Sequence, residues 1–206
     1  MNKFRSYVLS LLVKNCTKIY TFQVSSRYLS KIYSLQSFIS CRIIHWVIKM
    51  GMKTNAVRLV QQAGIPCREG FYEYDENDLS GIHAAKALAM PEDQVFKTLV
   101  ARGAKTGIHV FCIPVSCELD LKKAAKAAGD KNMELVAVKE LLGLTGYIRG
   151  GCSPVGMRKK YPTHFDESCI LYDEIAVSAG ERGHQMIVPP EALAVLVGAD
   201  LVDITV

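Results

Sequence analysis

The charge distribution changes abruptly at Met52, and this break limits where a folded domain can lie. Residues 1–51 carry five Lys and three Arg but no Asp or Glu, together with eight Ser. Their apolar residues follow no regular heptad or alternating order. Residues 52–206 carry 17 basic and 20 acidic side chains, a net charge of −3, with caps, turns and periodic apolar runs. We therefore expect one domain of ordinary size over residues 52–206.

The basic segment 1–51 has three interpretations. It has the composition of a transit peptide, which is basic, Ser-rich and poor in acids. It also suits a basic arm that touches nucleic acid. The third interpretation is translated leader sequence upstream of a true start at Met52. We favour the third, because the change of character coincides with a methionine, and we expect this extension not to be part of the fold.

Several classes of protein are excluded by what the sequence lacks. No run of 18 apolar residues occurs, so a membrane-spanning helix is not expected. The seven cysteines include no Cys-x-x-Cys pair, which argues against zinc ribbons and a disulfide framework and favours reduced thiols in the cytoplasm. The five histidines show no metal-ligand spacing. We expect no metal and no cofactor.

Helix and strand signals alternate after Met52 and predict a mixed α/β domain. Thr54 or Asn55, Ser80 and Asp120 are N-cap candidates that precede apolar-periodic runs. Helices are expected over 55–63, 80–90, 121–128, 139–142 and 190–197, and strands over 67–75, 95–101, 107–115, 174–178, 186–188 and 201–204. Hairpins as well as crossovers occur in this order, which favours a single domain with a mixed sheet.

Lys97 is the first candidate for chemistry. It lies within the apolar run Val95–Val100, and strand alternation places it on the same face as Val95 and Leu99. Burial would lower its pKa, and its ammonium would need a polar or anionic partner. The alternative is a strand-edge lysine whose head reaches water.

The segment 145–160 is the second candidate, because it holds four glycines within eleven residues and ends in a basic run. Glycines permit close approach of the main chain to a ligand, and the amides of Gly150, Gly151 and Cys152 are candidates for an oxyanion site. The alternative is an ordinary turn with a solvated basic face. Ser178, before a tight turn, is a ligand-binding candidate or a serine satisfied by backbone. A G-x-S-x-G motif and a cysteine-nucleophile signature are both missing.

Five motifs together resemble the YbaK/EbsC family over nearly all of residues 52–206. In chain order they read K-T-N-A-V-R-L-V (53–60), Q-V-F-K-T-L-V (94–100), E-L-D-L-K-K-A-A-K-A (118–127), T-G-Y-I-R-G-G-C-S-P-V-G-M-R-K-K (145–160) and V-S-A-G-E-R-G (177–183). The fourth is highly specific. The resemblance implies an α/β domain with a mixed, partly barrel-like sheet flanked by helices, like the editing domain of bacterial prolyl-tRNA synthetase.

The resemblance also implies a trans-editing aminoacyl-tRNA deacylase. Its implied partner is Cys-tRNA(Pro), with Cys-tRNA(Cys) and prolyl-tRNA synthetase as further partners, and no membrane. Cysteine and proline are similar in size, so a synthetase pocket rejects cysteine poorly and a second sieve is required. The implied nucleophile is the substrate's own thiol, which expels the tRNA and forms a cyclic thiolactone.

The site residues implied by the resemblance fall into three groups. The catalytic residues are Lys97, Gly150 and Tyr72; the substrate-binding residues are Gly151, Ser153, Ser178, Gln185 and Thr98; the candidates for tRNA phosphates are Arg158, Lys159 and Lys160. Many family members carry an acid where this chain has Gln185, so its charge is missing here. Two alternatives stay open: a non-catalytic regulator that binds aminoacyl-tRNA or a synthetase, and a deacylase for alanyl- or seryl-tRNA.

Overall fold

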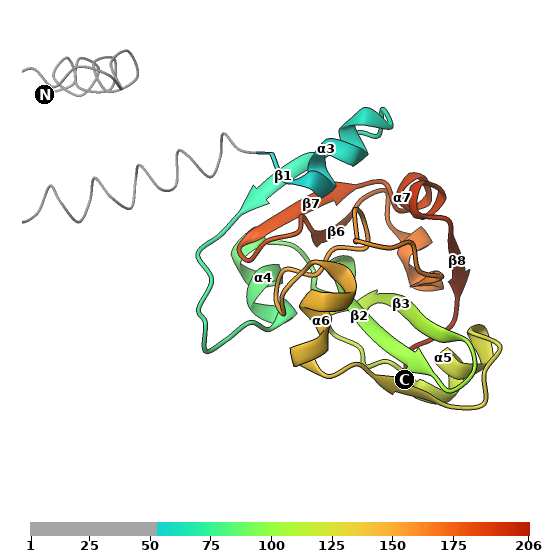
Figure 1. Cartoon of the computed structure of the whole chain (residues 1–206). Coiled ribbons are helices and arrows are strands. Elements are labelled where there is room, and N and C mark those ends of the chain that lie inside the picture. Colours follow the sequence, from blue (N-terminus) through green and yellow to red (C-terminus); the bar gives the residue numbers. More distant parts are fainter. Residues whose placement is uncertain (1–52) are drawn as a thin grey trace, which may run out of the picture. The chain divides into compact units, whose positions relative to one another are not determined.

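The computed structural model describes residues 53–206, and the expectations for residues 1–51 lie outside this range. Helices and strands alternate through it (Figure 1). The helices are α3 (Asn55–Gln62), α4 (Gly81–Leu88), α5 (Leu121–Ala127), α6 (Val138–Thr145) and α7 (Pro190–Val197), with short 3-10 turns η1 (Glu92–Gln94) and η2 (Glu167–Leu171). The strands are β1 (Arg68–Phe71), β2 (Phe96–Gly103), β3 (Gly107–Pro114), β4 (Met133–Leu135), β5 (Thr163–Asp166), β6 (Ile175–Ser178), β7 (His184–Val188) and β8 (Ala199–Val202). The predicted mixed α/β class is confirmed.

Side-chain caps explain where three of the helices begin. The hydroxyl of Thr54 accepts from the amide of Val57, and that of Ser80 accepts from His83. The carboxylate of Asp120 accepts from the amides of Lys122 and Lys123. Each contact satisfies an amide that has no partner within its helix. The helix starts predicted from these residues are therefore confirmed.

The strands form two sheets rather than the single sheet expected from the sequence. One sheet has the order β1-β7-β6, and the other has the order β4-β2-β3-β5-β8. In the larger sheet β2 pairs antiparallel with β3 and β4, whereas β5 pairs parallel with β3 and β8. An isolated parallel bridge between Val95 and Ala176 links the start of β2 to β6. Neither sheet closes on itself, so the expected partly barrel-like feature is not a closed barrel in residues 53–206.

Sequence patterns missed β4 and β5 and shifted the last strand. All four residues of β5 are buried although three of them are polar, so apolar alternation could not reveal it. The last strand spans Ala199–Val202 instead of the expected 201–204. The short helix expected over 139–142 extends over Val138–Thr145.

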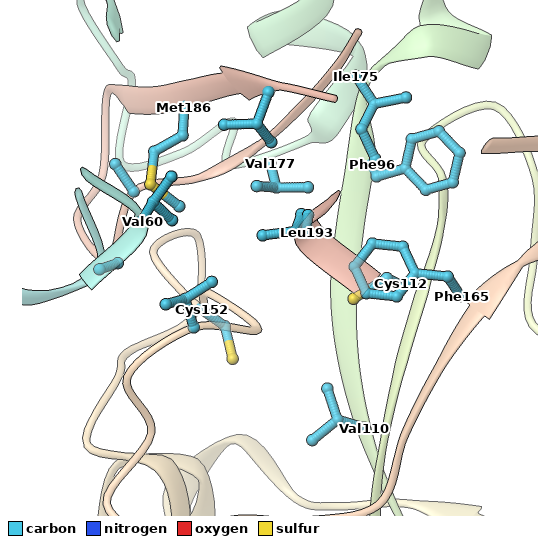
Figure 2. Packing of buried hydrophobic residues seen from close by; sticks show 14 of the residues in the cluster. Val60, Phe96, Val110, Cys112, Cys152, Phe165, Ile175, Val177, Met186 and Leu193 are labelled. Carbon is cyan, nitrogen blue, oxygen red and sulfur yellow. The ribbon is translucent and has the colours of Figure 1, made fainter. Parts of the chain in front are cut away.

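The main core lies where α3, α7 and the two sheets meet. Val60, Phe96, Cys112, Phe165 and Leu193 belong to this cluster, and all are almost completely buried (Figure 2). A second cluster packs Ala124 and Ala125 of α5 against Phe111 and Ile113 of β3. Together these clusters fix β2 and β3, the strands from which the candidate site is built. Within residues 53–206, no helix has the length and apolarity needed to cross a membrane.

Candidate active site

A cavity of about 560 Å³ opens beside the first half of β2. Its walls come from residues 95–100, the amino end of α4, the stretch 135–141 and the loop 149–152. Six residues predicted to act in catalysis or substrate binding line it: Tyr72, Lys97, Thr98, Gly150, Ser178 and Gln185. The fold therefore brings together residues that are separated by more than a hundred positions in the chain.

Lys97 places an amine on the cavity wall. It is half-buried on β2, where it lies opposite Ile113 of β3, and β4 pairs with β2 only farther along, at Ala101–Gly103. Its Nζ donates to the carbonyl of Val115 at 3.4 Å, a long hydrogen bond. Burial lowers the pKa of Lys97, and the nearby Glu118 acts in the opposite direction. The ammonium therefore retains donors for a ligand.

Gln185 and Tyr72 form a polar pair on the cavity wall. Gln185 is 6% exposed, and its Nε2 donates to Tyr72 Oη at 3.4 Å. Its Oε1 is buried and has no hydrogen-bond partner among residues 53–206. Burial raises the pKa of Tyr72, so its hydroxyl stays protonated. Because that oxygen accepts from Gln185, the hydroxyl proton is available to a ligand.

Ser178 and Thr98 contribute hydroxyl groups to the same cavity. Ser178 lies opposite Gln185 in the pairing of β6 with β7, and its Oγ accepts from the amide of Gly180 at 3.3 Å. Thr98 Oγ1 lies 3.7 Å from Cys112 Sγ. Both hydroxyls are held by the protein, which fixes their positions at the cavity wall.

The glycine-rich loop is built differently from the oxyanion site expected from the sequence. Gly150 has φ +83° and lines the cavity, as predicted. The amide of Gly151, however, donates to the carbonyl of Ile148 at 3.0 Å and so closes a turn. A Cβ on Gly151 would lie 3.0 Å from the main chain of Glu181. Gly151 thus packs closely within the loop, its amide is engaged in the turn, and it is not among the residues that line the cavity.

Ser153 and the basic run also lie outside the cavity wall. Ser153 is completely buried, and its Oγ accepts from the amide of Val155 at 3.3 Å, so its place is structural. Arg158, Lys159 and Lys160 are exposed and do not line the cavity. Any phosphate that they bind would lie elsewhere on the tRNA.

Arg149 and Cys152 also line the cavity; the sequence indicated Cys152 only through its amide and gave no site role to Arg149. Both lie within the fourth family motif, next to its glycines, and this position in the motif is the sequence signal that could have identified them. The thiol of Cys152 is buried, and this burial raises its pKa to about 12, so it remains protonated and a poor nucleophile.

The described cavity wall holds no carboxylate and no imidazole. Among the residues that the structure places on this wall, none is Asp, Glu or His. Within residues 53–206, Lys97 donates to the carbonyl of Val115 and not to the hydroxyl of Thr98 or Ser178, so neither hydroxyl is activated by this amine. Across residues 53–206, no group of three or more His, Cys, Asp or Glu is arranged to hold a metal ion. The chemistry available is charge stabilisation by Lys97, hydrogen bonding and positioning.

Comparisons with known proteins agree on one family. Residues 79–196 match the model of the aminoacyl-tRNA editing domain. A curated protein of Enterococcus faecalis is 46% identical over 157 residues, which is 76% of this chain and 96% of that protein. Its name assigns it, provisionally, as the Cys-tRNA(Pro)/Cys-tRNA(Cys) deacylase EbsC.

Solved structures share the fold. One, described provisionally as a trans-editing enzyme for prolyl-tRNA synthetase, is 27% identical, with a TM-score of 0.62 over 74% of this chain and 98% of that one. Another, a hypothetical protein, is 22% identical, with a TM-score of 0.66 over 72% of this chain and 97% of that one. The second likeness concerns the fold alone.

Proposed function

The chain belongs to the aminoacyl-tRNA editing domain family, and on this premise we propose that it is a trans-editing deacylase that removes cysteine from mischarged tRNA(Pro). Its relative from Enterococcus faecalis, 46% identical, carries the name of a deacylase for Cys-tRNA(Pro) and Cys-tRNA(Cys). A substrate shared with that relative requires a cavity for a small aminoacyl group, and the 560 Å³ cavity around Lys97 has the necessary size. tRNA(Cys) is the second tRNA in this proposal.

The observation that carries the mechanism is that the described cavity wall holds no carboxylate, no imidazole and no activated nucleophile. The one thiol there, Cys152, is kept protonated by burial. The reacting nucleophile must therefore arrive with the substrate or from solvent. A cysteinyl ester brings its own thiol, at a fixed short distance from the carbonyl carbon, which makes the attack intramolecular.

The proposed reaction forms a bond between the substrate's sulfur and its ester carbonyl carbon. The bond from that carbon to the ribose oxygen breaks, the terminal hydroxyl of the tRNA takes up the proton released by the thiol, and cysteine leaves as a thiolactone. The Lys97 ammonium stabilises negative charge on the sulfur and on the carbonyl oxygen. Gly150 shapes the wall, and Tyr72 offers its hydroxyl proton to the aminoacyl group.

The same mechanism accounts for selectivity among small amino acids. Alanine has no nucleophile on its side chain, and the hydroxyl of serine is much less acidic than a thiol, so neither ester is released by this route. An alanyl- or seryl-tRNA deacylase would need an activated water and a base to activate it. The described cavity wall offers no carboxylate or imidazole for this task, which favours cysteine as the substrate.

The test is deacylation of Cys-tRNA(Pro) by the full chain, with Ala-tRNA(Pro) and the Lys97→Ala variant alongside. The proposal predicts that only Cys-tRNA(Pro) loses its ester and that Lys97→Ala loses at least about 100-fold in rate. If wild type binds the tRNA but releases neither amino acid, the enzyme assignment is wrong and the protein is a binding regulator.

The proposal extends to partner and location. The described domain carries no excess of basic residues, and a protein of this charge binds tRNA weakly on electrostatic grounds. Association with prolyl-tRNA synthetase would supply the mischarged tRNA directly. Both would meet in the cytoplasm, where the synthetase acts.

A further inference from the structure

The charges on the cavity wall differ from those of the domain around it. Residues 52–206 hold more acids than bases. On the described wall, however, the charged residues are Lys97 and Arg149, with no acid among them. The amino end of α4 adds partial positive charge, because its first amides lack partners within the helix. Together these features make an anion-accepting cavity in an otherwise acidic domain.

Arg149 is held in place by its main chain while its side chain remains available. Its carbonyl accepts from Arg182 Nε at 3.0 Å. The neighbouring turn is closed by the hydrogen bond from Gly151 N to the carbonyl of Ile148. Arg149 itself is exposed, and its guanidinium shows no hydrogen bond or ion pair within residues 53–206. The loop thus contributes an exposed arginine to the lining of the cavity.

From this arrangement we infer that Arg149 binds the phosphate on the 5′ side of the terminal nucleotide of the tRNA. This inference rests on the proposed function, because the ester of an aminoacyl-tRNA and this phosphate are carried by the same ribose. Lys97, half-buried, faces the ester end, and Arg149, exposed, faces the chain leading out. A guanidinium suits this role, because its planar fork donates two parallel hydrogen bonds to phosphate oxygens.

The phosphate ligand proposed here, Arg149, differs from the residues that the contiguous basic run 158–160 suggests. Arg158, Lys159 and Lys160 are more conspicuous in the sequence, but they do not line the cavity. Arg149 has no basic neighbour in the sequence, and the fold places it among the residues that line the same cavity as Lys97. It also explains how a domain with a net negative charge can position the end of a polyanion, since one well-placed cation acts locally.

A first experiment needs no catalysis. Calorimetry compares binding of AMP and of adenosine, which differ in the 5′-phosphate, to the full chain. Wild type is expected to bind AMP about 10-fold more tightly, Arg149→Ala to lose this preference, and Arg149→Lys to keep part of it. Arg58→Ala, which removes an exposed arginine of α3 outside the cavity, should behave as wild type. Equal wild-type affinities for the two ligands, or a preference that survives Arg149→Ala, overturn the inference.

A second experiment measures kcat and KM for Cys-tRNA(Pro), and then for 3′-O-cysteinyl adenosine, which has no phosphate. Arg149→Ala should raise KM for the tRNA about 10-fold and reduce the slope of log KM against log salt concentration by about one, the value for one phosphate contact. It should leave KM for the adenosine ester unchanged. An equal loss on both substrates would mean that Arg149 acts on the ester or on the fold, against the inference. An inactive wild type would instead refute the deacylase proposal, and the AMP comparison would still decide the role of Arg149.

Discussion

Gln185 donates through Nε2 to the hydroxyl oxygen of Tyr72 at 3.4 Å, while its own Oε1 lies buried with no partner in the described part of the chain. A buried acceptor without a donor costs about 1–3 kcal/mol. The free protein therefore carries an unsatisfied group on a residue that lines the cavity. A donor on the substrate, such as its α-ammonium, would satisfy it on binding.

Gln185→Met tests this relationship, because it preserves volume and removes the unsatisfied oxygen. The variant should be as stable as wild type or more stable, by up to about 1 kcal/mol. It should also lose about 10-fold in kcat/KM for Cys-tRNA(Pro), because the substrate loses its acceptor. Thermal unfolding and steady-state deacylation measure the two quantities. A variant that is less stable and fully active would contradict this account of Gln185.

Cys152→Ala should retain deacylase activity within about threefold, since burial keeps this thiol protonated and away from the chemistry. Single-turnover rates with Cys-tRNA(Pro) provide the measurement. A loss of 100-fold or more would identify Cys152 as a protein nucleophile and exclude the substrate-thiol route.

Gly81→Ala should destabilise the domain. A Cβ at Gly81 would lie 2.1 Å from Val115 Cγ1 and 2.6 Å from its Cβ, and a side-chain rotation does not move the Cβ of Val115. The expected cost is about 1–3 kcal/mol, with a melting temperature lower by several degrees. Because Gly81 and Val115 both line the cavity, activity should fall as well.

Gly143→Ala is the matched control for that substitution. Gly143 lies within α6, and a Cβ there would meet no atom within 4 Å. The change should raise stability by about 0.5–1 kcal/mol, through helix propensity. If both glycine variants lose stability equally, the contact with Val115 is not the cause.

Acid should destabilise the fold through two buried histidines. His109 Nδ1 lies 3.1 Å from His164 Nε2, and burial lowers the pKa of both rings from an ordinary value of 6.5, with Asp130 and Asp200 opposing the shift. Below about pH 6.5 the unfolded chain takes up protons that the folded rings bind only at lower pH. Stability is therefore lost as the pH falls through this range.

The double variant His109→Phe/His164→Phe removes both titrating groups and should show a shallower fall in melting temperature between pH 7.5 and 5. Melting at pH 8 checks that the variant still folds cooperatively. Parallel curves for variant and wild type would assign the acid sensitivity to other groups.

The sequence predicted those parts of the fold that local chemistry determines. Thr54, Ser80 and Asp120 cap helices as expected, because capping depends on residues within one turn. β5 was not predicted because His164 is buried against His109 of the neighbouring strand β3, which lies 55 residues earlier in the chain. No local sequence pattern encodes this contact. Lys97 was recognisable as a charge within an apolar run.

The cavity itself was less predictable. Arg149 acquires its position from the hydrogen bond between its carbonyl and Arg182, 33 residues away. Gly151 appeared to be an amide donor, but the turn to Ile148 and the packing against Glu181 engage it. A contiguous basic run such as 158–160 is easily seen in a sequence, but whether a residue lines a cavity depends on the fold.

The central claim is that the substrate's own thiol releases cysteine in a cavity whose described wall holds no carboxylate or imidazole base. The most direct measurement compares release from Cys-tRNA(Pro) with release from the same tRNA carrying serine, in which oxygen replaces sulfur, or S-methylcysteine, in which the thiol is blocked. The account predicts rapid release of cysteine and rates near the uncatalysed level for the other two. Comparable enzymatic release of serine or S-methylcysteine would show that water is the nucleophile and would contradict the account.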